Sequence, residues 1–233
     1  MKFSIDEKIF EKWPEVVIGA LVINGFNNHG SDDRILKLLR DQENKTQQDL
    51  ASLEMGQIPE VATWRQIHKD FGSDPRDFPS SIEALLRRAR GGKQLPQINK
   101  LVDLYNYFSL KYKVPAGAED IDKISGDVAL TFATGTESGK YLGSDDIDAC
   151  FEGEVIYKDD EGFICRRWNW READRTKIDE NTKNALLVFE AAPPTTKETL
   201  DSLLAEAADL SAKYLGGKQT SFTLSKDNPQ IDF

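Results

Sequence analysis

The sequence predicts an α/β protein of the α+β kind, with mixed β-sheets flanked by helices. Three observations predict this class: β-branched apolar runs typical of buried strands, alternating apolar and polar residues from position 127 onward, and several segments with helical apolar spacing. The 233 residues suffice for a large core and include no linker rich in Pro, Gly or Ser. We therefore expect a single domain over 1–233, with a strand–helix part at about 1–75 and a core part at about 78–224.

The first 75 residues predict one strand and two helices. The apolar run 15–26 ends at glycine and asparagines and is typical of a buried strand. Residues 31–53 begin with a cap-like Ser-Asp-Asp and place Ile35, Leu38 and Leu39 at helical spacing. Residues 60–71 repeat that spacing on a face that includes His68, which we interpret as a packing residue rather than a ligand.

A helix over 80–90 is predicted by signals at both of its ends. Ser80 and Glu83 fit a capping box, and the glycines at 91 and 92 supply a left-handed stop. The exposed face gathers the densest positive cluster of the chain: Arg87, Arg88, Arg90 and the following Lys93. Two interpretations stay open, namely solvated arginines that favour a helix C-terminus and contacts to phosphate.

The next predicted helix, over 97–112, carries a polar stripe opposite its apolar side. Asn99, Asp103 and Asn106 recur at four- and three-residue spacing. Asn and Asp are poor helix formers that favour specific hydrogen bonds, so we interpret the stripe as tying neighbouring loops together and supporting a pocket. A direct contact between the stripe and a ligand is the alternative.

The second half of the chain predicts most of the sheet. Apolar residues alternate at 128–132 and 155–157, and a turn at 159–162 leads to a return strand at 163–165. A continuous apolar strand follows at 184–191, and then an amphipathic helix at 195–215 that two glycines close. Residues 220–224 add a short strand before a polar tail.

Segment 166–176 concentrates groups that could bind a ligand. Its eleven residues hold four arginines, two tryptophans and two carboxylates. As a strand, it would alternate its side chains between two faces. Arginine and aromatic groups together suit a flat or anionic ligand; alternatively, the tryptophans close the core and the arginines pair with acids. The candidate binding residues are Arg166, Arg167, Trp168, Asn169, Trp170 and Arg171.

The composition limits the partners of the protein. Acidic residues exceed basic ones by ten, which argues against a general affinity for polyanions, so contact with nucleic acid needs a local basic patch. Two histidines and two cysteines without ligand spacing predict no metal site and no cofactor. Because the first 22 residues lack a secretory pattern and no apolar run reaches the roughly 20 residues of a membrane helix, we expect a cytoplasmic protein.

The stretch that begins at Ser80 resembles a known family. The residues that carry the resemblance are Ser80, Ser81, Leu86, Arg87, Pro96, Asn99, Val102, Asp103 and Asn106. They resemble the pattern of the fused third and fourth domains of the bacterial phenylalanyl-tRNA synthetase β subunit. The resemblance continues through 127–137, 153–176 and 179–192, and so covers about the last two-thirds of the chain. It implies the fold of that editing domain, here as a freestanding protein.

The resemblance also implies site residues. In the synthetase, this domain clears wrongly attached amino acids from the tRNA 3′ end and recognises the amino-acid side chain with a Glu and a His. The Glu position falls close to Asp174, with Glu172 as its neighbour, and Gly117 stands where the family has its His. The resemblance thus implies Asp174, Glu172 and Gly117 as the catalytic site, with room at Gly117 for a different side chain or for the ligand backbone.

Hydrolysis of an activated aminoacyl ester needs only a positioned water and donors for the oxyanion. Backbone N–H groups in a glycine-bearing loop, such as 116–118 or 135–139, are the candidate donors. The leading hypothesis is a freestanding hydrolase that acts in trans on mischarged aminoacyl-tRNA, with the two arginine clusters holding the tRNA acceptor end. The alternatives are a non-catalytic tRNA- or RNA-binding module, and a protein that binds a free amino acid or another small molecule and has lost contact with tRNA.

Overall fold

The computed structural model describes residues 1–233, which form two larger β-sheets and one short hairpin. The strands are β1 (Lys2–Ile5), β2 (Val17–Asn24), β3 (Ala116–Asp120), β4 (Val128–Phe132), β5 (Ser138–Gly139), β6 (Asp148–Ala149), β7 (Val155–Lys158), β8 (Phe163–Arg166), β9 (Arg171–Glu172), β10 (Asn184–Ala191), β11 (Lys218–Leu224) and β12 (Gln230–Asp232). The helices are α1 (Glu7–Lys12), α2 (Asp33–Leu50), α3 (Pro59–Asp70), α4 (Ser81–Arg90), α5 (Lys100–Tyr112) and α6 (Lys197–Leu215). These elements confirm the predicted α/β class.

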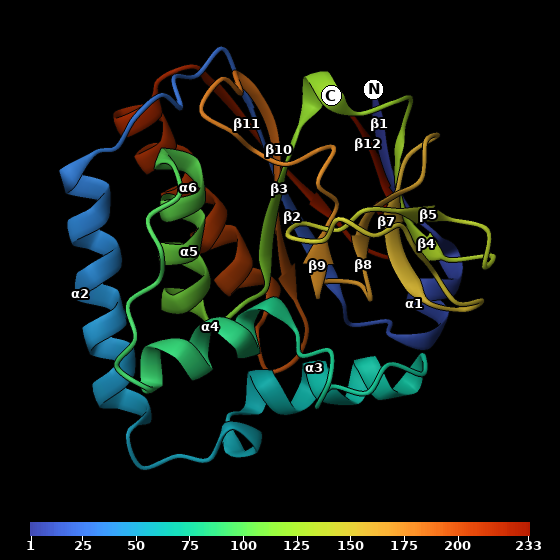
Figure 1. The fold of residues 1–233 in the computed structure, drawn as a ribbon, viewed down its shortest axis with the longest axis horizontal. Helices are drawn as coiled ribbons and strands as arrows, with labels where there is room; N and C mark the ends of the chain where they lie inside the picture. Colours follow the sequence, from blue (N-terminus) through green and yellow to red (C-terminus); the bar gives the residue numbers. More distant parts are fainter.

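The two sheets stand side by side, with helices on the outer face of one of them (Figure 1). The six-stranded sheet has the order β12-β1-β4-β7-β8-β9, and the four-stranded sheet has the order β11-β2-β10-β3. Helices α5 and α6 cover the outer face of the four-stranded sheet, and α2 packs outside α5. The inner face of that sheet is therefore free to turn toward the six-stranded sheet.

Strand β10 shows how the sequence separates these two faces. Phe189 points to the helices and packs against Phe108 of α5, with ring centroids 6.0 Å apart. Because side chains alternate along a strand, the neighbouring Val188 and Glu190 point to the opposite, inner face. In the antiparallel pairing with β3, Val188 lies opposite Gly117 and Leu186 lies opposite Glu119. The inner face therefore carries both apolar and acidic residues.

One continuous core joins the two predicted parts of the chain. It contains 54 buried apolar residues, drawn from the first strands, from α3 and from the last strands. Trp64 of α3, for example, contacts Trp168 with ring centroids 5.3 Å apart. None of the helices is long and apolar enough to cross a membrane.

Several elements differ from the sequence-based expectation. Residues 116–118, expected as a loop, lie in β3, and part of the polar tail forms β12, which pairs with β1 through Phe3 and Ile231. Segment 166–171 is not one strand, because Arg167 and Trp168 have φ of 48° and 65° and turn the chain between β8 and β9. Its side chains therefore do not alternate between two faces as predicted.

The predicted capping box at the start of α4 is only half formed. The Ser80 Oγ accepts a hydrogen bond from the Glu83 N–H at 3.4 Å. The Glu83 carboxylate does not return to Ser80; it forms ion pairs with Arg65 and Arg87 instead. A charged partner from α3 provides stronger hydrogen bonds than the backbone donor, so the tertiary contact replaces the local one.

Candidate functional site

A cavity of about 300 Å³ lies between the inner faces of the two sheets. Its walls are mostly apolar and include Ile164, Leu186 and Val188. Helices α4 and α5 contribute further lining residues, among them Asn106. The lining residues Leu142 and Arg171 are exposed, so they mark the rim where the cavity meets solvent.

Three glutamates from three different strands line this cavity. Glu119 comes from β3, Glu172 from β9 and Glu190 from β10. The register explains why they meet: Cys165 of β8 lies opposite both Glu172 and Tyr157, while Glu119 lies opposite Leu186. Each sheet thus points acidic residues into the same apolar space, where an ionised carboxylate is poorly solvated.

Glu190 is held by a chain of polar groups. Tyr157 OH donates to Glu190 Oε1 at 2.6 Å, and the Asn169 amide contacts Glu190 Oε2 at 2.5 Å. The other end of that amide lies 3.1 Å from His68 Nε2, and His68 Nδ1 lies 3.1 Å from the Phe78 carbonyl oxygen. Burial raises the pKa of Glu190 to about 7, although these hydrogen bonds oppose the shift.

The hydrogen-bond roles in this chain follow from the carbonyl oxygen at one end and the carboxyl group at the other. The Phe78 carbonyl oxygen can only accept, so His68 Nδ1 donates to it. The Asn169 Nδ2 donates to Glu190 Oε2, and the Asn169 Oδ1 faces His68 Nε2. Burial lowers the pKa of His68, which favours its neutral form. The predicted packing role of His68 therefore includes orienting Asn169.

Glu172 occupies the space above Gly117. Its Oε1 accepts a hydrogen bond from the Ala118 N–H at 3.2 Å. A Cβ at position 117 would lie 2.5 Å from that oxygen, so the absence of a side chain allows the carboxylate to approach. Burial raises the pKa of Glu172 to about 7, and the Ala118 N–H opposes the shift. The expected room at Gly117 is thus filled by Glu172, and the Ala118 N–H is already engaged.

Glu119 has fewer partners. Its side chain lines the cavity, and its Oε2 is buried without a hydrogen-bond partner. Burial, together with the neighbouring charge of Glu172, raises the pKa of Glu119 well above its ordinary value, while Thr176 and Arg175 oppose the shift. The site thus contains one glutamate held at both oxygens, one held at a single oxygen and one with a buried oxygen that lacks a hydrogen-bond partner.

Asp174 lies outside the cavity. Its carboxylate forms an ion pair with Lys177 at 2.7 Å, and both side chains are partly exposed. Of the three residues that the resemblance implies as catalytic, Glu172 and Gly117 line the cavity and Asp174 does not. Residues 135–139, candidates for oxyanion donors, do not line it either.

Arg166 is buried in an ion pair rather than presented to solvent. Its side chain is 2% exposed, donates to both oxygens of the buried Glu154 at 3.0 and 2.6 Å, and also pairs with Asp148. An arginine neutralised in this way supports the fold of the β8–β9 turn and is not available to a phosphate group.

The neighbouring residues of this segment divide between the core and the cavity. The Arg167 guanidinium stacks over the Phe78 ring at 3.6 Å. Trp168 is fully buried between Trp13 and Trp64. Trp170 and Arg171 line the cavity together with Trp168 and Asn169. Arg171 is the exposed member of the segment and lies at the cavity rim.

The basic cluster on α4 is mostly engaged with the protein. Arg87 pairs with Glu83, and the Nε atoms of Arg88 and Arg90 donate to backbone carbonyl oxygens at 2.8 and 3.2 Å. Arg87, Arg88 and Lys93 nevertheless remain exposed. Of these, Arg88 lies one helical turn beyond Ala84, which lines the cavity.

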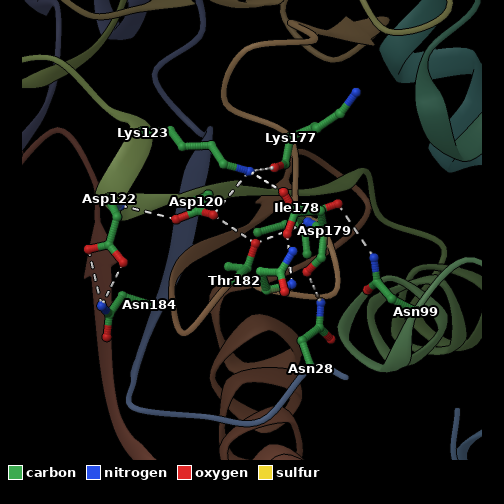
Figure 2. A network of polar contacts seen from close by, with 11 residues as sticks. Asn28, Asn99, Asp120, Asp122, Lys123, Lys177, Ile178, Asp179, Thr182 and Asn184 are labelled. Atoms are coloured by element: carbon green, nitrogen blue, oxygen red, sulfur yellow. Dashed lines mark hydrogen bonds and ion pairs between the residues drawn. The ribbon is translucent and has the colours of Figure 1, made fainter. Parts of the chain in front are cut away.

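The polar stripe of α5 contributes capping groups and one cavity residue. Asn99 begins the helix, since its Oδ1 accepts from the Val102 N–H at 3.0 Å and its Nδ2 donates to the Ile178 carbonyl at 3.4 Å (Figure 2). Asp103 accepts from the Ile98 N–H at 3.0 Å. Asn106 lines the cavity. The first two residues therefore tie loops together, and the third borders the site.

A second polar network begins at the end of β3 (Figure 2). Asp120 accepts a hydrogen bond from the Thr182 hydroxyl at 2.7 Å and pairs with Lys123 at 3.2 Å. Lys123 also pairs with Asp179 at 2.7 Å. These contacts fasten β3 to the loop before β10, and so keep Glu119 and Glu190 in neighbouring strands.

Sequence reasoning missed Glu119, Glu190 and Tyr157. The available signal was a carboxylate inside an apolar strand, as in the run that leads to Glu190. Burial of a carboxylate costs free energy unless hydrogen bonds or an opposite charge compensate for it, so its presence in such a run is a signal of a polar site. No group of three His, Cys, Asp or Glu side chains is arranged to hold a metal ion.

The fold and the cavity define an α/β protein with a small, mostly apolar pocket that several buried glutamates line. The sequence model of the B3/4 domain matches residues 63–214, which is more than half of the chain. The chain therefore belongs to the B3/4 domain family.

Comparison with known proteins gives two further similarities. The chain is 27% identical over 162 residues to the phenylalanine–tRNA ligase β subunit of Fusobacterium nucleatum, over 58% of this chain and 20% of that protein. It thus spans about a fifth of the length of this relative. An N-terminal fragment of the phenylalanyl-tRNA synthetase β subunit from Pyrococcus horikoshii aligns over 95% of this chain and 53% of its own, with a TM-score of 0.45 and 14% identity.

Proposed function

We propose that the cavity receives the aminoacyl end of a mischarged aminoacyl-tRNA and that the protein, acting in trans, hydrolyses its ester bond. The observation that carries the proposal is a pair of cavity carboxyl groups, Glu172 and Glu190, whose pKa values lie at about 7. Carboxyl groups tuned to neutral pH are typical of general acid–base sites. Membership of the B3/4 family and similarity to a phenylalanine–tRNA ligase β subunit support an aminoacyl-tRNA as the substrate.

Glu190 is the group best placed to act as the base. Tyr157 and Asn169 fix both of its oxygens, which limits the reorganisation needed during proton transfer. In the proposed reaction, ionised Glu190 accepts a proton from a water whose oxygen attacks the ester carbonyl carbon. The carbon–oxygen bond to the ribose then breaks, and the ribose oxygen takes the proton from Glu190. The products are a free amino acid and a tRNA.

Two exposed arginines flank the way into the cavity. Arg171 lines the rim, and Arg88 lies one turn beyond a lining residue of α4. They offer a local contact for the phosphates of an acceptor end on a chain whose net charge is −10. Their small number fits recognition of the tRNA terminus rather than of a long duplex.

The second candidate function is binding of a free amino acid or a related amine without hydrolysis. The acidic lining of the cavity and the acidic chain as a whole favour it, because neither is suited to a large polyanion. A non-catalytic RNA-binding module is the remaining alternative.

The test is a deacylation assay of the purified protein on a panel of mischarged aminoacyl-tRNAs. We expect hydrolysis of at least one substrate, in the presence of a chelator as well, and a loss of roughly 10²- to 10⁴-fold in Glu190→Gln. Glu152→Gln, at an exposed position, is the matched control and should retain wild-type activity. If no ester in the panel is hydrolysed, catalysis is refuted and amine binding becomes the leading function.

A further inference from the structure

Glu119 is a buried carboxyl group that the hydrolysis scheme does not use. It is 7% exposed, it lines the cavity, and its Oε2 has no hydrogen-bond partner. Buried polar atoms are nearly always hydrogen-bonded, and an unsatisfied carboxyl oxygen is costly. A carboxyl group with an unsatisfied oxygen on the wall of an apolar cavity is therefore a candidate acceptor for a donor that a ligand brings.

Glu172 faces the same space and is itself short of donors. The Ala118 N–H is its only hydrogen-bond partner, through Oε1. Glu172 lies over Gly117, and Glu119 is two residues further along the same face of β3, so the two carboxyl groups occupy neighbouring positions on the cavity wall. The other titratable groups around the pair are Tyr105 of α5, Cys165 of β8, Glu190 of β10, Asp159 and Arg175. Arg175 is the one cation among them.

Neither carboxyl group of this pair forms an ion pair with a cation of the protein. Arg175 lowers the pKa of Glu119, but both of its terminal nitrogens bond to Asp159, at 2.8 and 2.5 Å. Arg171 lines the cavity at its exposed rim, where its guanidinium lies over aromatic rings. Two neighbouring buried carboxyl groups without a dedicated counter-charge favour a ligand that brings one.

We infer that Glu119 and Glu172 form a paired carboxyl site for the ammonium group of an amphipathic primary amine, whose apolar part lies against Ile164, Leu186 and Val188. An ammonium group presents three donors, which suits the unfilled acceptor positions of two carboxylates. The paired carboxyl site rests on the proposed function only in the identity of its natural ligand. That ligand is an aminoacyl group whose α-ammonium or side-chain amine binds between Glu119 and Glu172.

The first test compares phenethylamine with 2-phenylethanol, which replaces the ammonium by a hydroxyl group. Trp168 and Trp170 line the cavity, so intrinsic fluorescence reports binding. The amine should bind at least about tenfold more tightly, because charge-assisted hydrogen bonds are the stronger kind. Glu119→Gln should lower amine affinity by about tenfold or more and leave alcohol affinity within about twofold. The control Glu152→Gln should change neither.

A second readout follows the proton that the pair shares. Two adjacent buried carboxyl groups hold a proton in the empty site, whereas an ammonium ligand favours both ionised forms. Amine binding at neutral pH should therefore release about one proton, measured by calorimetry in buffers of different ionisation enthalpy. Glu119→Gln should abolish the release. A purely structural role for Glu119 predicts no proton release in the wild-type protein.

The source of the ammonium is decided with three further ligands. Leucinamide against N-acetylleucinamide tests the α-ammonium, and Nα-acetyllysinamide tests a side-chain amine. Equal affinity for phenethylamine and 2-phenylethanol, no binding of either, or wild-type amine affinity in Glu119→Gln each overturns the inference. Amine binding without ester hydrolysis refutes the proposed hydrolase alone, and hydrolysis with no amine preference refutes the paired site alone.

Discussion

Glu172 Oε1 stands 2.5 Å from the point that a Cβ on residue 117 would occupy, so the carboxylate of one strand fills the space left by a glycine on another. The pairing is reinforced by the hydrogen bond from the Ala118 N–H to the same oxygen. A side chain at position 117 and the observed position of Glu172 are mutually exclusive. At the position where the resemblance implies a family histidine, Glu172 of β9 fills the space over Gly117.

Gly117→Ala should therefore displace the Glu172 carboxylate while the protein stays folded. The affected atom is the end of a flexible side chain, and Gly117 does not have a positive φ, so stability should change by less than about 1 kcal/mol. Amine affinity should fall by roughly tenfold, as in Glu172→Gln. Denaturant unfolding and fluorescence titration measure the two effects. Wild-type affinity in Gly117→Ala would show that the position of Glu172 is irrelevant to the ligand.

The stability of the protein should depend on the pH between about 4.5 and 7. Burial raises the pKa of Glu172 and of Glu190 from 4.5 to about 7. In this window the folded protein binds more protons than the unfolded chain, so the free energy of unfolding falls as the pH rises. The stabilisation is complete below pH 4.5 and is lost through pH 7, by up to about 3 kcal/mol for each carboxyl group.

Glu190→Gln separates this contribution from that of the other acids. Glutamine cannot titrate, so the variant should show a flatter dependence of stability on pH across the same window. Glu152→Gln, at an exposed site, should reproduce the wild-type curve. Unfolding by denaturant at a series of pH values gives the comparison. Identical slopes for wild type and Glu190→Gln would contradict the raised pKa of Glu190.

Arg166 and the exposed arginines should respond differently to substitution. Arg166→Met leaves Glu154 buried without its partner and should destabilise the fold by roughly 3–5 kcal/mol. The double variant with Glu154→Gln should recover part of that loss.

The double variant Arg88→Glu with Arg171→Glu should leave stability nearly unchanged, weaken tRNA binding and reduce the salt dependence of that binding. An unchanged salt slope in that variant would exclude both arginines from the tRNA contact.

Asn99→Ala should cost about 1–2 kcal/mol of stability. The substitution removes the cap on the Val102 N–H and the bond to the Ile178 carbonyl. Asn106→Ala on the same helix is the matched comparison, because Asn106 borders the cavity and caps nothing. It should change stability by less than about 0.5 kcal/mol. Equal losses in the two variants would argue against a capping role for Asn99.

Local patterns predicted the elements whose signals lie within one segment. The apolar run before Asn24, the helical spacing around Trp64 and the apolar side of the predicted helix over 97–112 all gave elements close to their observed bounds. Strand β3 was missed, because its Ala-Gly-Ala-Glu-Asp sequence has little apolar character. Its pairing with β10, far along the chain, makes it a strand.

The sequence by itself determined the α/β class and the family resemblance, and it selected Glu172 and Gly117, both of which line the cavity. Periodicity, caps and motifs act over a few neighbouring residues, and they can therefore be recognised in one dimension. Only the tertiary structure decided that Glu119, Glu172 and Glu190 share a cavity while Asp174 and Arg166 do not contribute to it. Strand register and burial set both the direction of a side chain and its pKa, and both depend on contacts between segments that lie far apart in the chain.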